Sequence, residues 1–392
     1  MVHNEYQQKG GEDRVVEDEI ELLRRHGHKV RLFSKSNKSI NSTNALNLFF
    51  NTVWSRRVES EIRNEIAAFD PDVMHVHNTF PLISPSIYWV ASRANVPVVQ
   101  TLHNFRLLCV QAMFLRNDQI CEDCLGRIPW RGVARQCYRN SIAQSATATA
   151  MLGVHRGIST YRDKIARFVA LSEFAKSKFV ESRQLKPDQL RVKPNFVDIE
   201  FKPALEDRKG GVFVGRLSRE KGLHVLASAI EQLKQAAVDV IGTGPEQSIL
   251  ENNLKLSSLG WKPKDFITDK MRAARYLIMP SICYENFPRT LVEAFACGLP
   301  VIASRLGALP EIVQEGHNGL LFDPGSAKDL ASKMAWADSH PSEMAEMGRN
   351  ARAAYESKYT AQQNYRQLMQ IYDEAIAIAR QTTILTPAPQ QI

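Results

Sequence analysis

Short apolar runs alternate with longer amphipathic stretches along most of the chain. Runs typical of buried strands occupy residues 29–34, 72–78, 97–104 and 168–172, and then 211–217, 238–244, 276–281, 300–304 and 319–323. This alternation is typical of parallel sheets whose strands are joined by helices. Because the pattern restarts after the turn at Pro194 to Asp198, we predict an α/β fold with two doubly wound, Rossmann-like domains facing a central cleft.

The predicted domains divide the chain near residue 198. Residues 1–198 form the N-terminal domain and residues 199–359 the C-terminal domain. Residues 360–381 form a last helix, for which a crossing back to the N-terminal domain is one option, and residues 382–392 form a flexible tail. Thr360 and Gln363 have the spacing of a capping box, which marks the start of the last helix.

The first expected strand is short. Only Met1 to His3 precede the loop that leads to Gly10 and Gly11, whereas strands average about five or six residues. A strand of three residues would leave backbone N–H and C=O groups of the neighbouring strands without hydrogen-bond partners. We therefore expect that the natural start lies upstream of Met1, with a genuine but weakened domain as the alternative.

The 392 residues have 44% hydrophobic content, and their net charge is +8. No apolar run reaches the roughly 18 residues that span a bilayer, and no signal-peptide pattern is present, so we expect a cytoplasmic protein, with peripheral contact at the inner face of the membrane as an option. Residues 1–200 hold 28 Lys and Arg against 21 Asp and Glu. We interpret this surplus as a diffuse solvated surface and predict no nucleic-acid binding.

Four of the six cysteines lie close together in the sequence, at Cys109, Cys121, Cys124 and Cys137. Four thiolates can form a tetrahedral zinc site that staples a long loop. Four reduced thiols are the alternative in a cytosolic protein. The site prediction therefore includes no metal.

Glu285 and Glu293 lie in the segment PSICYENFPRTLVEAFACGLPV, where a strand gives way to a helix. The apolar run Tyr276 to Met279 predicts the strand, and Thr290 to Cys297 predicts the helix. Ligands bind beyond the carboxyl ends of parallel strands, so a loop glutamate before a helix start marks a candidate ligand site. A helix cap and a surface ion pair are the alternative for two such glutamates.

Two cations follow the first strand of the second domain. Arg216 and Lys221 flank a turn in VGRLSREKGLHVL, after a strand that ends at Gly215. A guanidinium fork and a lysine ammonium suit a diphosphate, with two solvated charges as the alternative. Gly244 in IGTGPE allows either close backbone approach to a ligand or simply a tight turn.

In the first domain, Gly10 and Gly11 precede an amphipathic helix whose first backbone amides can meet a ligand. His103 ends the run PVVQTLHN, at the edge of the sheet where ligand-contacting groups gather. An ordinary turn and a structural histidine are the respective alternatives. Of His75 and His77, we expect one to lie in the core.

Taken in order, GRLSREKG, GTGP, the two glutamates with FACGLPV, and GALPEIVQEGHNGLLF resemble the retaining glycosyltransferases of family four, which have the GT-B fold. The resemblance is strongest in residues 211–323. It is looser in the first domain, where VHNEYQQKGGE, HVHN, TLHNFRLLC and KPNFVD fit the family pattern. It implies transfer of a sugar from a nucleotide-diphosphate donor to a saccharide or lipid-linked acceptor, with retention at the anomeric carbon and no cofactor.

The resemblance also implies roles for the candidate residues. Residues 1–198 would take the acceptor and residues 199–359 the nucleotide sugar. Arg216 and Lys221 would hold the diphosphate and stabilise the leaving group. The other implied contacts are Glu285 with sugar hydroxyls, Glu293 with the ribose, His103 with the sugar, the backbone amides of Asn286 and Phe287, and the glycines Gly10, Gly11, Gly215 and Gly244.

No second carboxylate is placed for a double displacement, so the resemblance favours front-face attack assisted by the leaving phosphate. Other functions stay open. One is a different GT-B enzyme, such as an epimerase or a phosphorylase, because fold does not fix reaction. Another is a catalytically inactive nucleotide-sugar-binding protein, and a basic adaptor for nucleic acid or membrane ranks last.

Overall fold

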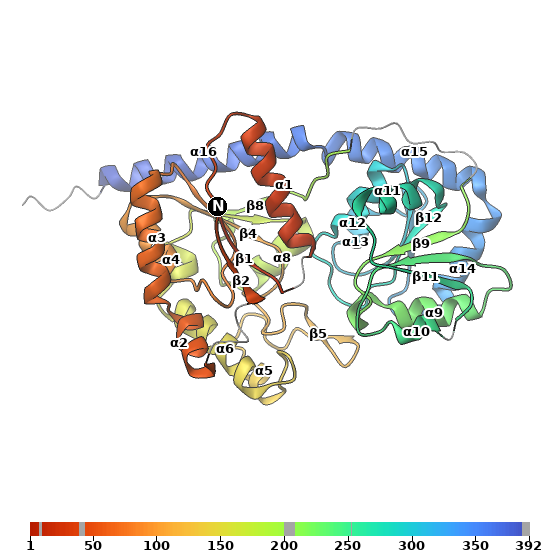
Figure 1. The fold of residues 1–392 in the computed structure, drawn as a ribbon, viewed down its shortest axis with the longest axis horizontal. Coiled ribbons are helices and arrows are strands. Elements are labelled where there is room, and N and C mark those ends of the chain that lie inside the picture. The colour runs from red at the N-terminus through yellow and green to blue at the C-terminus, as the bar shows by residue number, and fades with distance from the viewer. Residues whose placement is uncertain (8–9, 39–43, 200–207, 252, 386–392) are drawn as a thin grey trace, which may run out of the picture. The chain divides into compact units, whose positions relative to one another are not determined.

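The computed structural model describes residues 1–392 except 8–9, 39–43, 200–207, 252 and 386–392 (Figure 1). Its contacts divide the chain into two compact units: Met1–Ala112, Glu122–Pro194 and the chain from Tyr365 onward form the first, and Met113–Cys121 with Asn195–Asn364 form the second. Each unit contains a parallel six-stranded sheet, which confirms the two doubly wound sheets predicted from the sequence. Among the described helices, none combines the length and the apolar composition of a transmembrane span.

The sheet of the first unit has the strand order β2-β1-β3-β4-β7-β8, and all its pairings are parallel. Its strands are β1 (Val2–Glu5), β2 (Phe33–Ser36), β3 (Met74–Asn78), β4 (Val98–Leu102), β7 (Arg167–Ala170) and β8 (Leu190–Val192). The helices are α1 (Gly11–Arg25), α2 (Ala45–Val53), α3 (Arg56–Phe69), α4 (Ile87–Arg93), α5 (Trp130–Ala134), α6 (Ile142–Gly157), α7 (Thr160–Asp163), α8 (Glu173–Glu181) and most of α16 (Ala361–Leu385).

Strand β1 is longer than the apolar pattern indicated. The prediction of a strand limited to Met1–His3 is wrong, because Val2–Glu5 pair in register with Phe33–Ser36 of β2. The pattern missed Asn4, whose side chain is fully buried. Its amide donates to Asn37 Oδ1 at 2.8 Å, and its oxygen accepts from the backbone N–H of Leu82 at 2.8 Å. Satisfied hydrogen bonds thus let a polar residue continue a buried strand.

Helix α16 supplies an apolar face to the first unit. Its buried side chains pack with Leu23 of α1, Val99 of β4 and Val169 of β7, and they are Leu368, Ile371, Tyr372 and Ala375. The backbone N–H of Gln363 donates to Thr360 Oγ1 at 3.3 Å, which is one half of the predicted capping box. The helix continues to Leu385, and the rest of the predicted tail, 386–392, lies outside the described residues.

The sheet of the second unit has the strand order β11-β10-β9-β12-β13-β14, again all parallel. Its strands are β9 (Gly211–Val214), β10 (Val238–Ile241), β11 (Leu256–Gly260), β12 (Tyr276–Met279), β13 (Val301–Ser304) and β14 (Gly319–Phe322). Its helices are α9 (Leu223–Glu231), α10 (Ser248–Glu251), α11 (Lys264–Ala273), α12 (Arg289–Ala296), α13 (Leu309–Ile312), α14 (Ala327–Ser339) and α15 (Pro341–Lys358).

The strand order of the second sheet reverses at β9, which pairs with β10 on one side and β12 on the other. Ligands of doubly wound sheets bind beyond the carboxyl ends of the strands at such a switch point. The loops that follow β9 and β12 touch at Gly222, where φ is +73° and an added Cβ would lie 1.8 Å from the carbonyl oxygen of Pro280. Only glycine fits there.

A hairpin from the first half of the sequence belongs to the second unit. Its strands β5 (Leu115–Arg116) and β6 (Gln119–Ile120) are antiparallel. They are joined by Asn117 and Asp118, which have φ values of +49° and +59°, as in a type I′ turn. Leu115 packs in the core of the second unit, and the Arg219 guanidinium donates to both carboxylate oxygens of Asp118. Its contacts therefore place this segment in the second unit, although the residues on either side of it in the sequence belong to the first.

Candidate functional site

The carboxyl ends of β9 and β12 bring Lys221 and Glu285 together. Lys221 Nζ donates to Glu285 Oε1 at 2.7 Å, and the hydroxyl of Ser281 donates to the same oxygen at 2.7 Å. The backbone of Glu285 is also held, because its carbonyl oxygen accepts from the N–H of Ala308 at 3.1 Å. A cation and a carboxylate predicted for one site therefore lie in direct contact.

The electrostatics of this pair keep both groups charged. Burial by itself raises the pKa of the Glu285 carboxyl, but the Lys221 ammonium and the two hydrogen bonds outweigh it and hold that pKa below its ordinary value. Burial likewise opposes the charge on Lys221, yet the Glu285 carboxylate raises the pKa of Lys221 above its ordinary value. The site thus presents an ammonium and a carboxylate with fixed positions at neutral pH.

Arg216 lies in the loop after β9 and is exposed. Its guanidinium makes no hydrogen bond or ion pair with any side chain that the structure describes, in contrast to nearby Arg219. Gly215, just before it, has room for a side chain, because an added Cβ would approach only the Phe213 ring, at 3.9 Å. Gly244 has no such room, since its Cβ would lie 2.3 Å from the carbonyl oxygen of Leu217. Gly244 is therefore required for packing of the loop.

The remaining candidates of the second unit lie at the start of α12. Glu293 accepts a hydrogen bond from Arg289 Nε, one helical turn earlier, at 2.9 Å. Asn286 and Phe287 are buried, and the carbonyl oxygen of Phe287 accepts from Asn195 Nδ2 at 3.0 Å. Glu285 and Glu293 thus have different cationic partners.

In the first unit, His103 directly follows β4 and contacts His77 of β3. His103 Nε2 lies 2.9 Å from His77 Nδ1, and the two rings stack with their centroids 5.2 Å apart. Burial lowers the pKa of His103 to about 3, although Glu19 opposes the shift. Burial and the neighbouring His103 lower the pKa of His77 well below its ordinary value. Both imidazoles are neutral at pH 7, and one proton joins their facing nitrogens.

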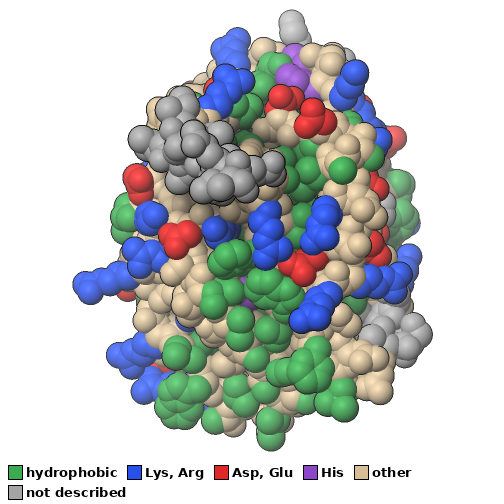
Figure 2. Space-filling view, turned by 90° about the vertical axis from the view of Figure 1, so that its left-hand side faces the viewer, with side chains coloured by type: hydrophobic (Ala, Val, Ile, Leu, Met, Phe, Trp, Pro, Cys, Tyr) green, Lys and Arg blue, Asp and Glu red, His purple; other side chains and the backbone are tan. Residues whose placement is uncertain are grey.

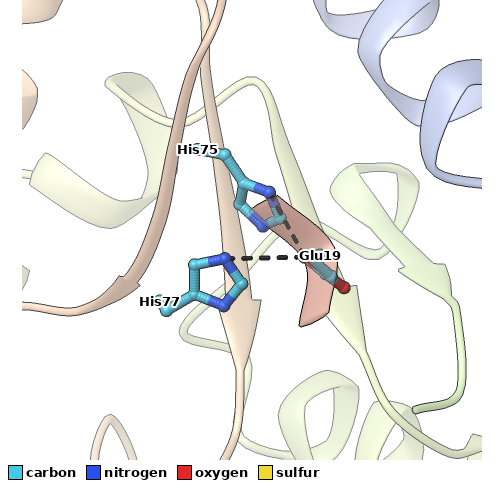
Figure 3. Close-up of side chains that lie close together, drawn as sticks. All are labelled: Glu19, His75 and His77. Atoms are coloured by element: carbon cyan, nitrogen blue, oxygen red, sulfur yellow. Dashed lines mark ion pairs between the residues drawn. The ribbon is translucent and has the colours of Figure 1, made fainter. Parts of the chain in front are cut away.

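A buried network surrounds Glu19 of α1 (Figure 3). Glu19 Oε2 lies 3.8 Å from His75 Nδ1 and 3.6 Å from His77 Nε2. The prediction that only one of these histidines lies in the core is wrong, because both are buried. Residues two apart on a strand share a face, so both rings of β3 point toward α1.

Lys193 completes this network with a buried ion pair. Its Nζ donates to Glu19 Oε1 at 2.6 Å, and the two side chains are 0% and 1% exposed. Burial alone would raise the pKa of Glu19, but the Lys193 ammonium outweighs it and holds that pKa below its ordinary value. Neither residue was among the candidates from the sequence.

The ligand atoms of Glu19, His75 and His77 lie within 4.8 Å of one another, a spacing that suits a metal ion. However, most of the nitrogen and oxygen atoms that could bind a metal already have hydrogen-bond partners. His75 Nδ1 is hydrogen-bonded to Tyr372 Oη at 2.7 Å, and His75 Nε2 to Thr101 Oγ1 at 2.8 Å, while the lysine occupies one oxygen of the carboxylate. We interpret the cluster as an ion-pair network that orients the histidines.

The loop of Gly10 and Gly11 is held by Asp13 of α1. Helix α1 begins at Gly11, and the backbone N–H of Gly10 donates to Asp13 Oδ2 at 2.8 Å. Asp13 Oδ1 in turn is hydrogen-bonded to His3 Nε2 at 2.8 Å. A Cβ added to Gly11 would have no described atom within 4 Å. The start of α1 therefore leaves space in which a ligand can approach its backbone.

Glu12, which follows Gly11, is a further candidate that the sequence analysis missed. It accepts a hydrogen bond from the hydroxyl of Tyr6 at 3.0 Å, and its other oxygen lies 3.9 Å from His3 Nδ1. Burial raises the pKa of Glu12 to about 7, even though His3 and Tyr6 oppose the shift. Groups that titrate near neutral pH cluster at functional sites.

Glu12→Gln is expected to stabilise the protein at pH 8 and to change its stability little at pH 5. Between the ordinary pKa of 4.5 and the folded pKa of about 7, the folded state binds more protons than the unfolded state, so stability falls as pH rises through this window. Ionising Glu12 in the folded state costs about 3 kcal/mol, and glutamine lacks that cost. Urea denaturation at both pH values measures the difference, and an equal effect at pH 5 and pH 8 would contradict it.

The choice between four reduced thiols and a zinc site at the four clustered cysteines stays untested. Cys109 is buried, and Cys121, Cys124 and Cys137 are half-buried. Cys109, Cys124 and Cys137 belong to the first unit, whereas Cys121 ends the hairpin segment of the second. Measurement of stoichiometric zinc in freshly purified, reduced protein decides between a metal and four thiols.

The two parallel sheets and their switch points place the chain among proteins with the GT-B fold. Sucrose-phosphate synthase from Thermosynechococcus elongatus superposes with a TM-score of 0.71 at 19% sequence identity, over 95% of this chain and 96% of that one. Anabaena HepE in complex with UDP superposes with a TM-score of 0.66 at 17% identity, over 95% and 98%. These likenesses confirm the predicted fold of two Rossmann-like domains.

The family is shown by the sequence matches. Residues 9–201 match the family model of Glycosyltransferase Family 4, and residues 208–337 match that of Glycosyl transferases group 1. The chain therefore belongs to the glycosyltransferases that these two models describe, as its motifs predicted. It is 25% identical to a sulfoquinovosyl transferase of Arabidopsis thaliana over 71% of its own length and 52% of that protein. The chain thus spans about half the length of this curated relative.

Proposed function

We propose that the chain is a retaining hexosyltransferase that moves a sugar from a nucleotide-diphosphate donor to an acceptor hydroxyl, in the synthesis of a polysaccharide, lipopolysaccharide or glycolipid. The observation that carries this proposal is the placement of Arg216, Lys221 and Glu285 at the switch point of the second sheet. Two cations at that position suit the anionic diphosphate of a nucleotide sugar, and the carboxylate suits the hydroxyls of its sugar.

The donor diphosphate binds Arg216 and Lys221. Arg216 is exposed and has no competing carboxylate among the described residues, so its guanidinium is available as a fork for phosphate oxygens. Lys221 adds a charge that Glu285 holds in place. Because one solved protein with this fold is described in complex with UDP, UDP is the first nucleotide to test.

Glu285 binds hydroxyls of the transferred sugar, since Ser281 and Lys221 fix one carboxylate oxygen and the carboxylate accepts hydroxyl hydrogens well. Glu293 binds the ribose of the nucleotide, and the backbone amides of Asn286 and Phe287 assist at the start of α12. Gly215 and Gly244 shape the loops beside the donor. In the first unit, Gly10 and Gly11 border donor and acceptor.

In the proposed reaction, the bond between the anomeric carbon and the β-phosphate oxygen breaks while the acceptor oxygen bonds to the same carbon from the same face. The proton of the acceptor hydroxyl passes to an oxygen of the leaving diphosphate. Arg216 and Lys221 stabilise the negative charge that develops on the diphosphate. No metal takes part in this step.

His103 contacts the sugar as a hydrogen-bond acceptor. The Glu19 carboxylate faces His77 Nε2, so it favours a proton on that nitrogen. His77 Nδ1 then accepts from His103 Nε2, and His103 Nδ1 is left with a lone pair. The buried network therefore selects the tautomer with which His103 meets a sugar hydroxyl.

The stereochemistry of the product tests the proposal. The enzyme is incubated with an α-linked donor such as UDP-glucose and a panel of saccharide and lipid acceptors, and the anomeric proton of the product is read by NMR. An α-linked product supports retention, whereas a β-linked product would show inversion. Tight nucleotide-sugar binding without any product would instead favour a catalytically inactive binding protein.

A further inference from the structure

Helices α2, α5 and α6 of the first unit expose large apolar side chains. Seven of the eleven exposed large hydrophobic residues among the described ones lie on or beside these helices, and we call them the apolar surface: Leu46, Phe50, Ile128, Trp130, Ile142, Val154 and Ile158. Helix α6 packs against both α2 and α5. Figure 2 draws the side of the molecule that lies on the left in Figure 1. Hydrophobic side chains gather at its lower end, where Figure 1 places α2 and α6.

The exposed fractions of these side chains are large. Leu46 and Phe50, one turn apart on α2, are 68% and 66% exposed, and Trp130 at the start of α5 is 61% exposed. Burying such a side chain gains roughly 1.5–3 kcal/mol, and a contiguous apolar surface on a soluble protein marks an interaction site.

The two segments that carry the apolar surface hold charges of a single sign. Residues 124–162 contain six arginines and no aspartate or glutamate, and residues 44–55 contain no charged side chain. Arg127, Arg131 and Arg139 make no ion pair with any described residue. The basic surplus of the first half, which the sequence analysis interpreted as diffuse, is therefore concentrated beside the exposed apolar side chains.

We propose that the apolar surface, together with Arg127, Arg131 and Arg139, binds the surface of an anionic phospholipid bilayer. Apolar side chains enter the boundary between headgroups and acyl chains, tryptophan favours that depth, and arginines pair with lipid phosphates. The surface lies on the first unit alone, so this inference goes beyond the proposed reaction and does not depend on it.

Other occupants fit the same surface less well. A second copy in a symmetric dimer would bring its own unpaired arginines against these, with no carboxylate in residues 124–162 to compensate. Nucleic acid would pair with the arginines but would leave the aliphatic side chains Leu46, Ile142 and Val154 without a partner, since it offers phosphates and stacking faces. A bilayer of anionic lipid supplies both kinds of contact.

Sedimentation with vesicles tests this inference on the full-length protein. Vesicles of phosphatidylcholine alone are compared with vesicles of phosphatidylcholine and phosphatidylglycerol. The variants are Phe50→Ser with Trp130→Ser, and Arg127→Gln with Arg131→Gln and Arg139→Gln. The matched control is Trp261→Ser in the second unit, where Trp261 is 73% exposed.

The wild type and the control are expected to bind the anionic vesicles, and to bind them more weakly at high salt. Loss of the two aromatic side chains is expected to weaken binding by at least about tenfold. Loss of the three arginines is expected to weaken it by about a hundredfold. Unchanged melting temperatures show that the variants are folded.

Depth of insertion gives a second reading. Brominated phosphatidylglycerol is expected to quench tryptophan fluorescence, with most of the quenching lost in Trp130→Phe and kept in Trp261→Phe. The proposal is overturned if the wild type does not sediment with anionic vesicles, or if the aromatic variant binds as the wild type does. It is also overturned if the arginine or aromatic variants instead abolish a dimer seen by analytical ultracentrifugation without lipid.

Discussion

Arg216→Ala is expected to lower kcat/KM for the nucleotide sugar by about 10²–10³-fold, because removal of one group that stabilises developing negative charge typically has that effect. The folded state should not change, since the Arg216 side chain is exposed and makes no hydrogen bond or ion pair with a described side chain. Arg216→Lys should recover part of the activity, because it keeps the charge and loses the guanidinium fork. The rate of nucleoside diphosphate release at steady state gives kcat/KM for the wild type and both variants.

Arg219, three residues further along, provides the matched control. Its guanidinium is exposed and already pairs with Asp118 of the hairpin, with a closest contact of 2.6 Å. An exposed pair of this kind contributes about 0–1 kcal/mol to stability. Arg219→Ala should therefore leave kcat/KM within a few-fold of the wild type. Equal losses in Arg216→Ala and Arg219→Ala would show that only the general charge of the loop matters.

Lys193→Met is expected to destabilise the first unit by about 3–5 kcal/mol, because removing one partner of a buried ion pair leaves the other charge uncompensated. The Glu19 carboxylate would then remain at 1% exposure beside two histidines that burial keeps neutral. Urea denaturation of the variant and the wild type at pH 7 measures the loss. A loss below about 1 kcal/mol would be typical of an exposed pair.

Two further variants isolate the cause. Lys193→Met combined with Glu19→Leu removes both charges, and replacing a whole buried pair with apolar groups is often neutral or stabilising. The double variant should therefore be more stable than Lys193→Met alone. Lys186→Met, in the exposed pair with Asp163, should change stability by about 1 kcal/mol or less. A double variant as unstable as the single one would assign the loss to packing.

The sequence predicted the architecture well because a single physical rule governs it. Buried parallel strands are short apolar runs, so the alternation located both sheets and the loops at their carboxyl edges. The same rule brought Lys221 and Glu285 together, since each follows a strand at the switch point. It failed where polar residues extend a strand, as at Asn4 in β1.

The buried network escaped the sequence analysis because its members are far apart in the chain. One local signal was present, however. Glu19 lies on the apolar stripe of α1, three residues after Val16 and four before Leu23, where a solvated glutamate does not belong. A charge at such a position requires a buried partner. The partner, Lys193, follows strand β8 and could be identified only from the fold.

The sequence analysis missed two other features, for different reasons. Charges were counted over half the chain, and this count concealed the segment 124–162, which has arginines but no acidic residue. These arginines indicate a binding surface only together with the exposed apolar side chains, which the structure shows. The hairpin of β5 and β6 had a turn signal in Asn117 and Asp118, but its place in the second unit depends on Leu115 and on the Asp118 contact with Arg219. Such contacts join residues far apart in the chain and cannot be predicted from the local sequence.

Thermal denaturation of the wild type and of Arg216→Ala with UDP, GDP, ADP and dTDP in turn tests whether a nucleotide binds beside Arg216. A ligand that binds the folded state raises the melting temperature. We expect one of these nucleotides to raise the melting temperature of the wild type, and we expect this rise to disappear in Arg216→Ala. The absence of any rise in the wild type, or an equal rise in both proteins, would contradict a nucleotide-sugar site at Arg216.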